Sequence, residues 1–278
     1  MVRRDVWTAS YSIFHYILMS FLSGTPLQIV NANIQSYIFQ MKDLKQEQVF
    51  SVTQLFWQVC LNLMGRNNLE DPIKLVGDAV NEERHRYLSK DSALKFTFLI
   101  NRFVLLAYFG RHVESADLTA KEGVDCLSKG APGVVHIQWE TYLRGLSCFA
   151  AAQQTGKAKY KQLGQKFRRK IKSWLEQGNP NVAHYEALLD AEKLACDGKH
   201  AGAVRRYELA ILLSARGGHQ SDAALASERL GQFFLSMGGD EEEARYRLHE
   251  AAKYWKSWGA LGKVHALEEQ YPFLVQNS

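Results

Sequence analysis

Apolar residues recur along most of the chain at spacings of three and four, which place them on one face of an α-helix. From Tyr160 onward they fall at Leu163, Phe167, Ile171 and Trp174, with polar residues between them. No clear run alternates apolar and polar residues as a half-buried strand would. The pattern therefore predicts an all-α fold.

Glycine and proline mark the ends of the predicted helices. Glycine adopts the left-handed conformation that ends a helix at little steric cost. A polar residue before proline, as in Asp71-Pro72 and Asn179-Pro180, is typical of a helix start. The breaks predict helices over residues 5–23, 27–45, 47–64, 72–88, 92–109, 113–128, 134–155, 158–176, 181–197, 200–216, 221–237 and 240–257, with a short helix over 260–270.

Part of the chain repeats itself after 41 residues. An internal period of about 20 to 50 residues indicates stacked repeats, in which each unit covers the apolar face of its neighbour. The matched pairs are Leu189 with Leu230, Leu194 with Leu235, Gly198 with Gly239, Ala203 with Ala244, Tyr207 with Leu248, Ala210 with Ala251 and Gly218 with Gly259.

Small side chains flank a large one in each repeat, which lets two helices approach closely. Such triplets are Ala203, Tyr207, Ala210, then Ala244, Leu248, Ala251, and more weakly Ala116, Ala120, Gly123. The sequence predicts a right-handed, tetratricopeptide-like α-solenoid of about six antiparallel helix hairpins. We expect one domain over residues 1–278, with amino-terminal hairpins in 1–130, a middle hairpin in 131–180, and the best-matched repeats and a cap in 181–278.

The composition is that of an ordinary folded protein. Of the 278 residues 46% are hydrophobic and 23% are charged, and the formal net charge of +5 permits an acidic partner without requiring one. Cys60, Cys126, Cys148 and Cys196 stand far apart. They predict buried thiols and a cytoplasmic or other reducing intracellular compartment.

The amino-terminal segment allows two interpretations. Arg3 and Arg4 precede an apolar stretch from Tyr11 to Leu22, which is similar to a short secretion signal. However, Asp5 lies in the basic region, and the stretch is interrupted by polar residues and too short to span a bilayer. We favour a buried helix over an export signal.

The sequence offers no recognisable catalytic or cofactor motif. A GxxxxGK[ST] phosphate loop is absent, because Val264 follows the Gly262-Lys263 pair. Dinucleotide-binding, zinc-protease and paired-cysteine motifs are absent as well. We therefore expect no enzymatic activity, no cofactor and no metal site.

Two groups of titratable residues also have a structural interpretation. Glu82, Glu83 and His85 could begin a metal site, but a solvated helix end is favoured because no further ligand is near in the sequence. For His112 and Glu114, which follow a helix break, a capping or surface role is favoured over catalysis. Neither group predicts a reaction.

A group of aromatic residues near the carboxyl end has two interpretations. Trp255 and Trp258, with Tyr254, could form a base-stacking surface. Their helical spacing favours a buried seam that closes the final hairpin.

One segment is strongly basic, with eight basic residues and no acidic one. These are Lys157, Lys159, Lys161, Lys166, Arg168, Arg169, Lys170 and Lys172. The apolar stripe between them is expected to be buried, so the charges crowd the exposed side. Such a face could bind the phosphates of a nucleic acid, an anionic membrane or an acidic protein. The alternative, which we favour, is a solvated face balanced by neighbouring Asp and Glu.

The final third of the chain carries a more specific pattern. Its landmarks are NPNVAHYEALLDAEKLACDGKHAGAVRRYELAI, ALASERLGQFFLSMG, Trp258-Gly259-Ala260, Lys263-Val264, Leu267 and Tyr271-Pro272. They resemble the tetratricopeptide-like region of very large signalling proteins of cyanobacteria and some algae and fungi. SFLSG at 20–24, Leu61 to Gly65 and Tyr108 to Gly110 extend the resemblance more loosely over nearly the whole chain.

The resemblance implies a role in signal transduction. In that family, a Ser/Thr-kinase-like domain and a predicted AAA-type ATPase precede the repeats. A GAF domain and often a histidine-kinase or cyclase-like module follow them. The residues that would transfer phosphate are missing from this chain, so the resemblance implies no phosphoryl transfer here.

Three roles stay open from the sequence. The first is a protein–protein interaction scaffold or sensor-linker, whose concave side holds a peptide or a partner domain. The second is a structural subunit of a larger assembly, with contacts at its amino-terminal end and homo-oligomers among its forms. An enzyme with an unrecognised site is least favoured. We expect protein partners, with nucleic acid or an anionic membrane as less favoured partners of residues 157–172.

Overall fold

The computed structural model describes residues 2–66, 71–91, 94–125, 136–238 and 240–277. Within these residues the chain forms thirteen α-helices, two short 3₁₀ helices and no strand, which confirms the all-α prediction. The α-helices are α1 (Val2–Leu22), α2 (Leu27–Asp43), α3 (Glu47–Leu63), α4 (Glu82–Lys90), α5 (Lys95–Tyr108), α6 (His112–Glu122), α8 (His136–Thr155), α9 (Ala158–Glu176), α10 (Ala183–Cys196), α11 (His200–Arg216), α12 (Gln220–Ser236), α13 (Glu241–Trp258) and α14 (Leu261–Gln270). The 3₁₀ helices are η1 (Pro180–Val182) and η2 (Pro272–Asn277).

The chain divides into two compact units. Unit 1 comprises Met1–Leu105 and Trp255–Ala266, and unit 2 comprises Leu106–Tyr254 and Leu267–Ser278. The boundaries fall within α5, α13 and α14, so these helices contribute residues to both units. The expectation of one continuous array over residues 1–278 stays a prediction.

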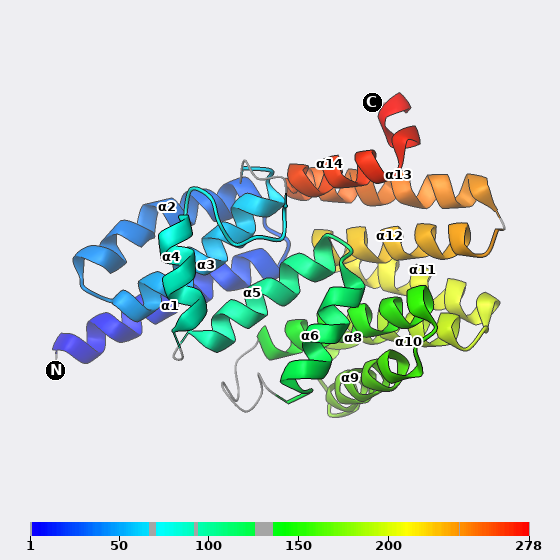
Figure 1. The fold of residues 1–278 in the computed structure, drawn as a ribbon, viewed down its shortest axis with the longest axis horizontal. Coiled ribbons are helices and arrows are strands. Elements are labelled where there is room, and N and C mark those ends of the chain that lie inside the picture. The colour runs from blue at the N-terminus through cyan, green and yellow to red at the C-terminus, as the bar shows by residue number, and fades with distance from the viewer. Residues whose placement is uncertain (1, 67–70, 92–93, 126–135, 239, 278) are drawn as a thin grey trace. The chain divides into compact units, whose positions relative to one another are not determined.

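In unit 1, helices α1, α2 and α3 pack against one another (Figure 1). The apolar side of α1 faces this core, because Ile17 and Phe21 are fully buried. The Phe21 ring meets the rings of Phe56 and Trp258 edge to face, with centroids 5.1 and 4.9 Å away. One face of the amino-terminal helix is therefore buried, as predicted. No helix in the described part of the chain has both the length and the apolar character needed to cross a bilayer.

The aromatic residues near the end of α13 are buried rather than displayed. Trp255 and Trp258 are both 0% exposed, and Tyr254 is half-buried. The two tryptophans are therefore buried as predicted, and Trp258 packs on Phe21 of α1 within unit 1. They cannot stack on bases, since no ring face is open to solvent.

The predicted helix over residues 72–88 is wrong in its first half. Residues 72–80 form turns and bends, and α4 begins only at Glu82. Its cap is Asn81, whose side chain accepts a hydrogen bond from a backbone N–H of the first turn. Asp71 caps no helix, because its carboxylate accepts the backbone N–H two residues further on, as in a tight turn.

Side-chain amides of α3 hold the segment before α4 in its non-helical form. Gln58 Oε1 accepts the backbone N–H groups of Ala79 and Val80, both at 3.1 Å. Asn62 Nδ2 donates to the carbonyls of Pro72 and Lys74, both at 2.8 Å. These tertiary bonds satisfy backbone groups that a helix would satisfy internally. Helical periodicity in the sequence cannot reveal such a competitor.

Two other predicted boundaries behave differently. Asn179 does mark a helical start, with its side chain accepting the N–H of Asn181 at 3.1 Å, but the first turn is the 3₁₀ helix η1. The helix predicted over 113–128 ends at Glu122, where Gly123 takes a φ of +86°. Residues 126–128 lie outside the described residues.

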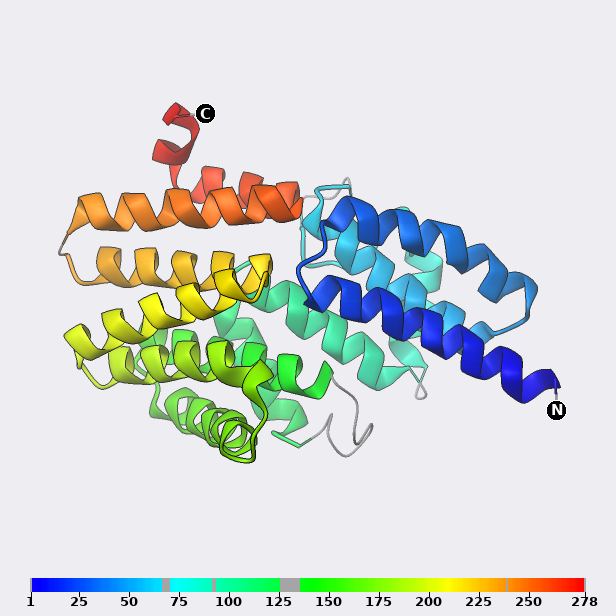
Figure 2. The same cartoon turned by 180° about the vertical axis from the view of Figure 1, so that it is seen from behind.

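Unit 2 is built from successive helix hairpins. Helix α8 packs against α9, α10 packs against α11, and α10 also contacts α8 and α12. Figures 1 and 2 show α10, α11 and α12 side by side with alternating direction. The first helices of neighbouring hairpins thus contact each other, as well as their own partners.

The two strong triplets of the repeat occupy equivalent buried positions. Ala203, Tyr207 and Ala210 on α11 and Ala244, Leu248 and Ala251 on α13 are all at most 1% exposed. The weaker triplet is wrong as a packing motif, because Ala116 is buried while Ala120 is exposed and Gly123 is half-buried. The 41-residue match therefore reflects equivalent packing in α11 and α13.

The described cysteines are free thiols, but not all are buried. Cys60 and Cys148 are fully buried, and burial raises the pKa of Cys148 to about 12. Cys196 is half-buried, which differs from the prediction, although burial still raises its pKa to about 12. Cys126 lies outside the described residues.

Candidate interaction surface on helix α9

Helix α9 is anchored by its predicted apolar stripe. Tyr160, Phe167 and Ile171 are at most 1% exposed, and Leu163 and Trp174 are half-buried. Ala116 of α6 and Cys148 of α8 belong to the same core cluster as Tyr160 and Phe167. Because this stripe faces α6 and α8, the basic side chains of α9 lie around the remainder of the helix.

Four of the eight basic residues of this segment form ion pairs. The pairs are Lys159 with Asp117 at 3.3 Å, Lys161 with Asp197 at 2.8 Å, Arg168 with Asp190, and Lys172 with Glu176 at 3.6 Å. For these four residues, the contacts agree with the prediction that neighbouring acids balance the charge of the helix face. The acids come from α6, from α10 and the residue that follows it, and from α9 itself.

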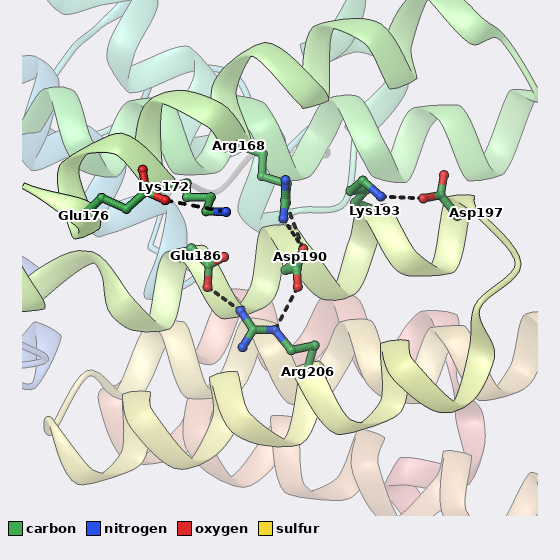
Figure 3. Close-up of polar contacts among 8 residues, drawn as sticks. All are labelled: Arg168, Lys172, Glu176, Glu186, Asp190, Lys193, Asp197 and Arg206. Carbon is green, nitrogen blue, oxygen red and sulfur yellow. Dashed lines mark hydrogen bonds and ion pairs between the residues drawn. The ribbon is translucent and has the colours of Figure 1, made fainter.

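Asp190 of α10 is shared between two cations. Figure 3 shows it between Arg168 of α9, whose Nε donates to Oδ1 at 2.9 Å, and Arg206 of α11, whose Nε lies 3.0 Å from Oδ2. Arg206 also pairs with Glu186, one turn before Asp190 on α10. Two arginines and two carboxylates therefore join α9, α10 and α11 into one charge network.

Asp197, which follows α10, is shared in the same way. Lys161 and Lys193 lie 2.8 and 2.6 Å from its two oxygens. Hydrogen bonds from Lys161 and then Lys193 hold the pKa of Asp197 below its ordinary value. Asp197 thus faces two cations and leaves one of them unbalanced, whereas Asp190 and Glu186 together balance Arg168 and Arg206.

The other four basic residues have no ion-pair partner among the described residues. They are Lys157, Lys166, Arg169 and Lys170. Lys166, Arg169 and Lys170 are spaced at i, i+3 and i+4, so they share one side of α9. Lys166 and Arg169 are exposed, and Lys170 Nζ lies 5.5 Å from the Trp174 ring centroid. We refer to Lys166, Arg169 and Lys170 as the α9 basic face.

A basic depression lies on the other side of the charge network. It has a volume of about 580 Å³ and is lined by Asp190, Leu194, Lys199, His200, Ala201, Gly202, Arg205 and Arg206. Its lining includes three lysine or arginine side chains and one aspartate. Asp190 and Arg206 belong both to this lining and to the network that reaches α9.

A buried ion pair beneath α9 was not foreseen from the sequence. Arg144 is fully buried, pairs with Glu140 at 2.5 Å, and lies over the Phe167 ring at 4.8 Å. It also donates to the carbonyls of Gly123 and Val124, which follow α6. Burial raises the pKa of Glu140, although Arg144 opposes the shift. The pair fastens the end of α6 to α8, the helix that α9 covers.

The acidic pair beside His85 stays at a helix end, as favoured from the sequence. Glu82 and Glu83 lie in the first turn of α4. A hydrogen bond from Lys74 lowers the pKa of Glu82, and the ring of half-buried His85 lies 5.4 Å from that of Phe98. The one metal-ligand cluster found in the described residues lies elsewhere.

The expected surface role of His112 is wrong. It is 3% exposed at the start of α6, and its Nδ1 lies 3.4 Å from Ser147 Oγ of α8. Glu114 does lie at the surface, where it pairs with Arg111. Packing of α6 on α8 buries the histidine, and the sequence carries no local signal for that contact.

Comparison of the chain with protein-family models, with curated proteins and with solved structures gives no match. The resemblance to the repeat region of large signalling proteins therefore rests on the sequence landmarks alone.

Proposed function

We propose that this chain is a non-catalytic protein-interaction module that binds an acidic segment of a partner protein. Its helix hairpins form the right-handed solenoid of about six units expected from the sequence. The order of packing in unit 2 supports this architecture, because α10 contacts both its hairpin partner α11 and the neighbouring helices α8 and α12. Repeat arrays of this kind offer binding surfaces rather than reaction centres.

The positive charge of α9 carries the proposal. At about 100° per residue, the α9 basic face lies roughly opposite Arg168 around α9, while Lys199 and Arg205 line the depression beside Arg206. A partner that contacts both sets of cations must therefore cross the exposed side of α9 as well as α10. Complementary charge of this kind steers association and sets the register of a complex.

Interspersed acids favour a protein over a polyanion as the partner. Glu176, Glu186 and Asp190 lie among the cations, each in an ion pair (Figure 3). A continuous row of phosphates would meet these carboxylates as well as the lysines. A protein segment can place its acids opposite cations and its other side chains opposite the acids.

The sequence landmarks support a more specific role for the module. We propose that it acts as a scaffold or sensor-linker related to the signalling ATPase and kinase family that it resembles. In that role the bound partner is coupled to an output domain carried on another segment or another chain.

A structural subunit is the second candidate, and exposed apolar side chains favour it. Large apolar residues on α1 and α2 are 45–65% exposed: Trp7, Tyr16, Met19, Ile29 and Phe39. Side chains of this kind are enriched where proteins meet. Light scattering over a range of concentrations tests this role. A monomer at every concentration contradicts homo-oligomerisation through these residues.

Reversing the charge of the α9 basic face is expected to abolish most acidic-peptide binding. The variant is Lys166→Glu/Arg169→Glu/Lys170→Glu, and the probe is a fluorescent peptide rich in Glu and Asp. Exposed ion pairs contribute about 0.2–1 kcal/mol each, so losing and reversing three of them should weaken binding by about tenfold or more. Fluorescence anisotropy measures the dissociation constant at several salt concentrations.

A matched control distinguishes an effect of the α9 basic face from an effect of the overall net charge. Arg216→Glu/Lys253→Glu/Lys256→Glu makes the same change of charge at exposed positions elsewhere, and we expect peptide affinity close to wild type. Equal loss in both variants means that the peptide senses only overall charge, which contradicts the proposed surface. Tighter binding of random duplex DNA or phosphatidylserine vesicles than of the peptide contradicts the protein partner.

A further inference from the structure

Three side chains outside the α9 surface meet at the amino-terminal ends of α10 and α12. His184 lies in the first turn of α10, His219 directly precedes α12, and Asp222 lies in the first turn of α12. His184 Nε2 lies 3.1 Å from Asp222 Oδ2. The two imidazole rings stack nearly parallel, with centroids 4.7 Å apart. One nitrogen or oxygen atom from each residue lies within 4.8 Å of those from the other two.

The Asp222 carboxylate has an unused acceptor in this cluster. Asp222 is 3% exposed, and its Oδ1 is buried without a hydrogen-bond partner among the described residues. Burial removes water from this oxygen, and an acceptor left without a replacement costs folding free energy. Buried carboxylates are retained where a hydrogen-bond donor, a cation or a metal ion supplies the missing contact.

Aromatic side chains line the same region. The rings of Tyr142 and Tyr185 stack with centroids 4.2 Å apart. The ring of Tyr185 also lies 4.0 Å from that of His184, centroid to centroid. An apolar shell of this kind strengthens the interaction between a carboxylate and a cation, because it excludes water.

We propose that His184, His219 and Asp222 form a binding site for a divalent transition-metal ion of the zinc class. Two imidazole nitrogens and one carboxylate oxygen match zinc sites that keep a fourth position for water or another ligand. Magnesium and calcium prefer sites made of oxygen ligands alone. The sequence predicted no metal site, because His184 lies on a different helix from the short His219-x-x-Asp222 spacing.

The ion links helices of two successive hairpins. His184 belongs to α10, and His219 and Asp222 belong to the start of α12. The positive ends of both helix dipoles oppose a cation here, so we expect weaker binding than at an all-cysteine zinc site. Binding to the folded state alone raises stability by mass action, so thermal unfolding reports occupancy.

Zinc binding is measured on the full chain without an affinity tag. Calorimetric titration with Zn²⁺ is expected to give one ion per chain, and Co²⁺ is expected to give the visible absorption of a tetrahedral site. At a free Zn²⁺ concentration of about 100 times the dissociation constant, the Tm should rise by about 5 °C. His219→Gln should weaken binding by about 100-fold or more, since loss of an outer-shell partner alone costs 10–100-fold.

Two further variants test the carboxylate ligand and a histidine outside the site. Asp222→Asn removes the carboxylate charge while keeping its shape, and it should also lose the Zn²⁺-dependent rise in Tm. His249→Gln removes a half-buried histidine of the same unit and should bind as wild type does. Circular dichroism checks that each variant folds.

Absence of Zn²⁺ and Co²⁺ binding in the wild-type chain overturns the site and leaves a buried His–Asp hydrogen bond. Equal affinity in His219→Gln and His249→Gln overturns it too, because the ion then lies elsewhere. The acidic-peptide experiment uses other residues, so either proposal can fail without the other.

Discussion

Replacement of Arg229 by methionine is expected to lower the free energy of unfolding by about 3–5 kcal/mol. Arg229 is 5% exposed and donates from Nε and Nη2 to the two oxygens of Glu192, at 2.7 and 3.0 Å. Burial by itself would lower the pKa of Arg229, but the charge and hydrogen bonds of Glu192 outweigh it and raise the pKa. Without the guanidinium, a fully buried carboxylate keeps a neutral amide, Gln153 Nε2 at 2.6 Å, in place of an opposite charge.

The position of this ion pair explains the size of the expected loss. Gln153 lies on α8, Glu192 on α10 and Arg229 on α12, so one polar group joins the first helices of three successive hairpins. Arg229 Nη1 also donates to Gln232 at 2.6 Å. Removing one partner leaves the other charge buried without an opposite charge. This costs more free energy of folding than the ion pair itself contributes.

A double-mutant cycle tests this explanation by urea denaturation. Glu192→Met/Arg229→Met should recover at least about half of the loss, because removing both charges removes the unpaired one. Arg216→Met, at an exposed position, should change stability by less than about 0.5 kcal/mol. A double variant as unstable as the sum of its single variants would show that the two side chains act independently.

Replacement of Gly262 by alanine is expected to cost about 3 kcal/mol of stability. A Cβ atom there would lie 2.6 Å from the backbone nitrogen of Gly65 and 2.7 Å from the carbonyl oxygen of Asn62. Both are backbone atoms at the end of α3, so no flexible side chain can move aside. The start of α14 must therefore separate from α3, which opens unit 1.

Gly202 provides the matched control for the same substitution. It lies within α11, and a Cβ atom there would lie 3.5 Å from the nearest atom, a side-chain carbon of Leu194. Gly202→Ala should therefore stabilise the chain by about 0.5–1 kcal/mol, because alanine favours the helix. Urea denaturation measures both variants. Similar stability of Gly262→Ala and wild type would contradict the close backbone contact.

Helix positions could be predicted well wherever local signals agree. The helices predicted over 158–176 and 200–216 have the bounds of α9 and α11, because apolar spacing and a following glycine point to the same ends. Apolar spacing fails to predict the structure of residues 72–80. Their spacing is compatible with a helix, but hydrogen bonds from Gln58 and Asn62 of α3 compete for the backbone.

The basic surface was only half predictable. The run of eight cations is visible in the sequence, and so is the apolar stripe that turns them outward. The sequence does not tell which cations are neutralised, because Asp117, Asp190 and Asp197 lie on other segments of the chain. Packing of α9 beside α6 and α10 brings Lys159, Lys161 and Arg168 into ion pairs with these acids. The α9 basic face forms no ion pair among the described residues.

The sequence by itself determined the all-α class, most helix bounds and the equivalence of α11 with α13. Helical periodicity and chain breaks act over a few residues, so they can be read directly from the order of amino acids. Tertiary structure decided which charges are paired and which histidines meet a carboxylate. Ion pairs and metal ligands depend on distances of a few ångströms between helices, and those distances exist only once the hairpins have packed.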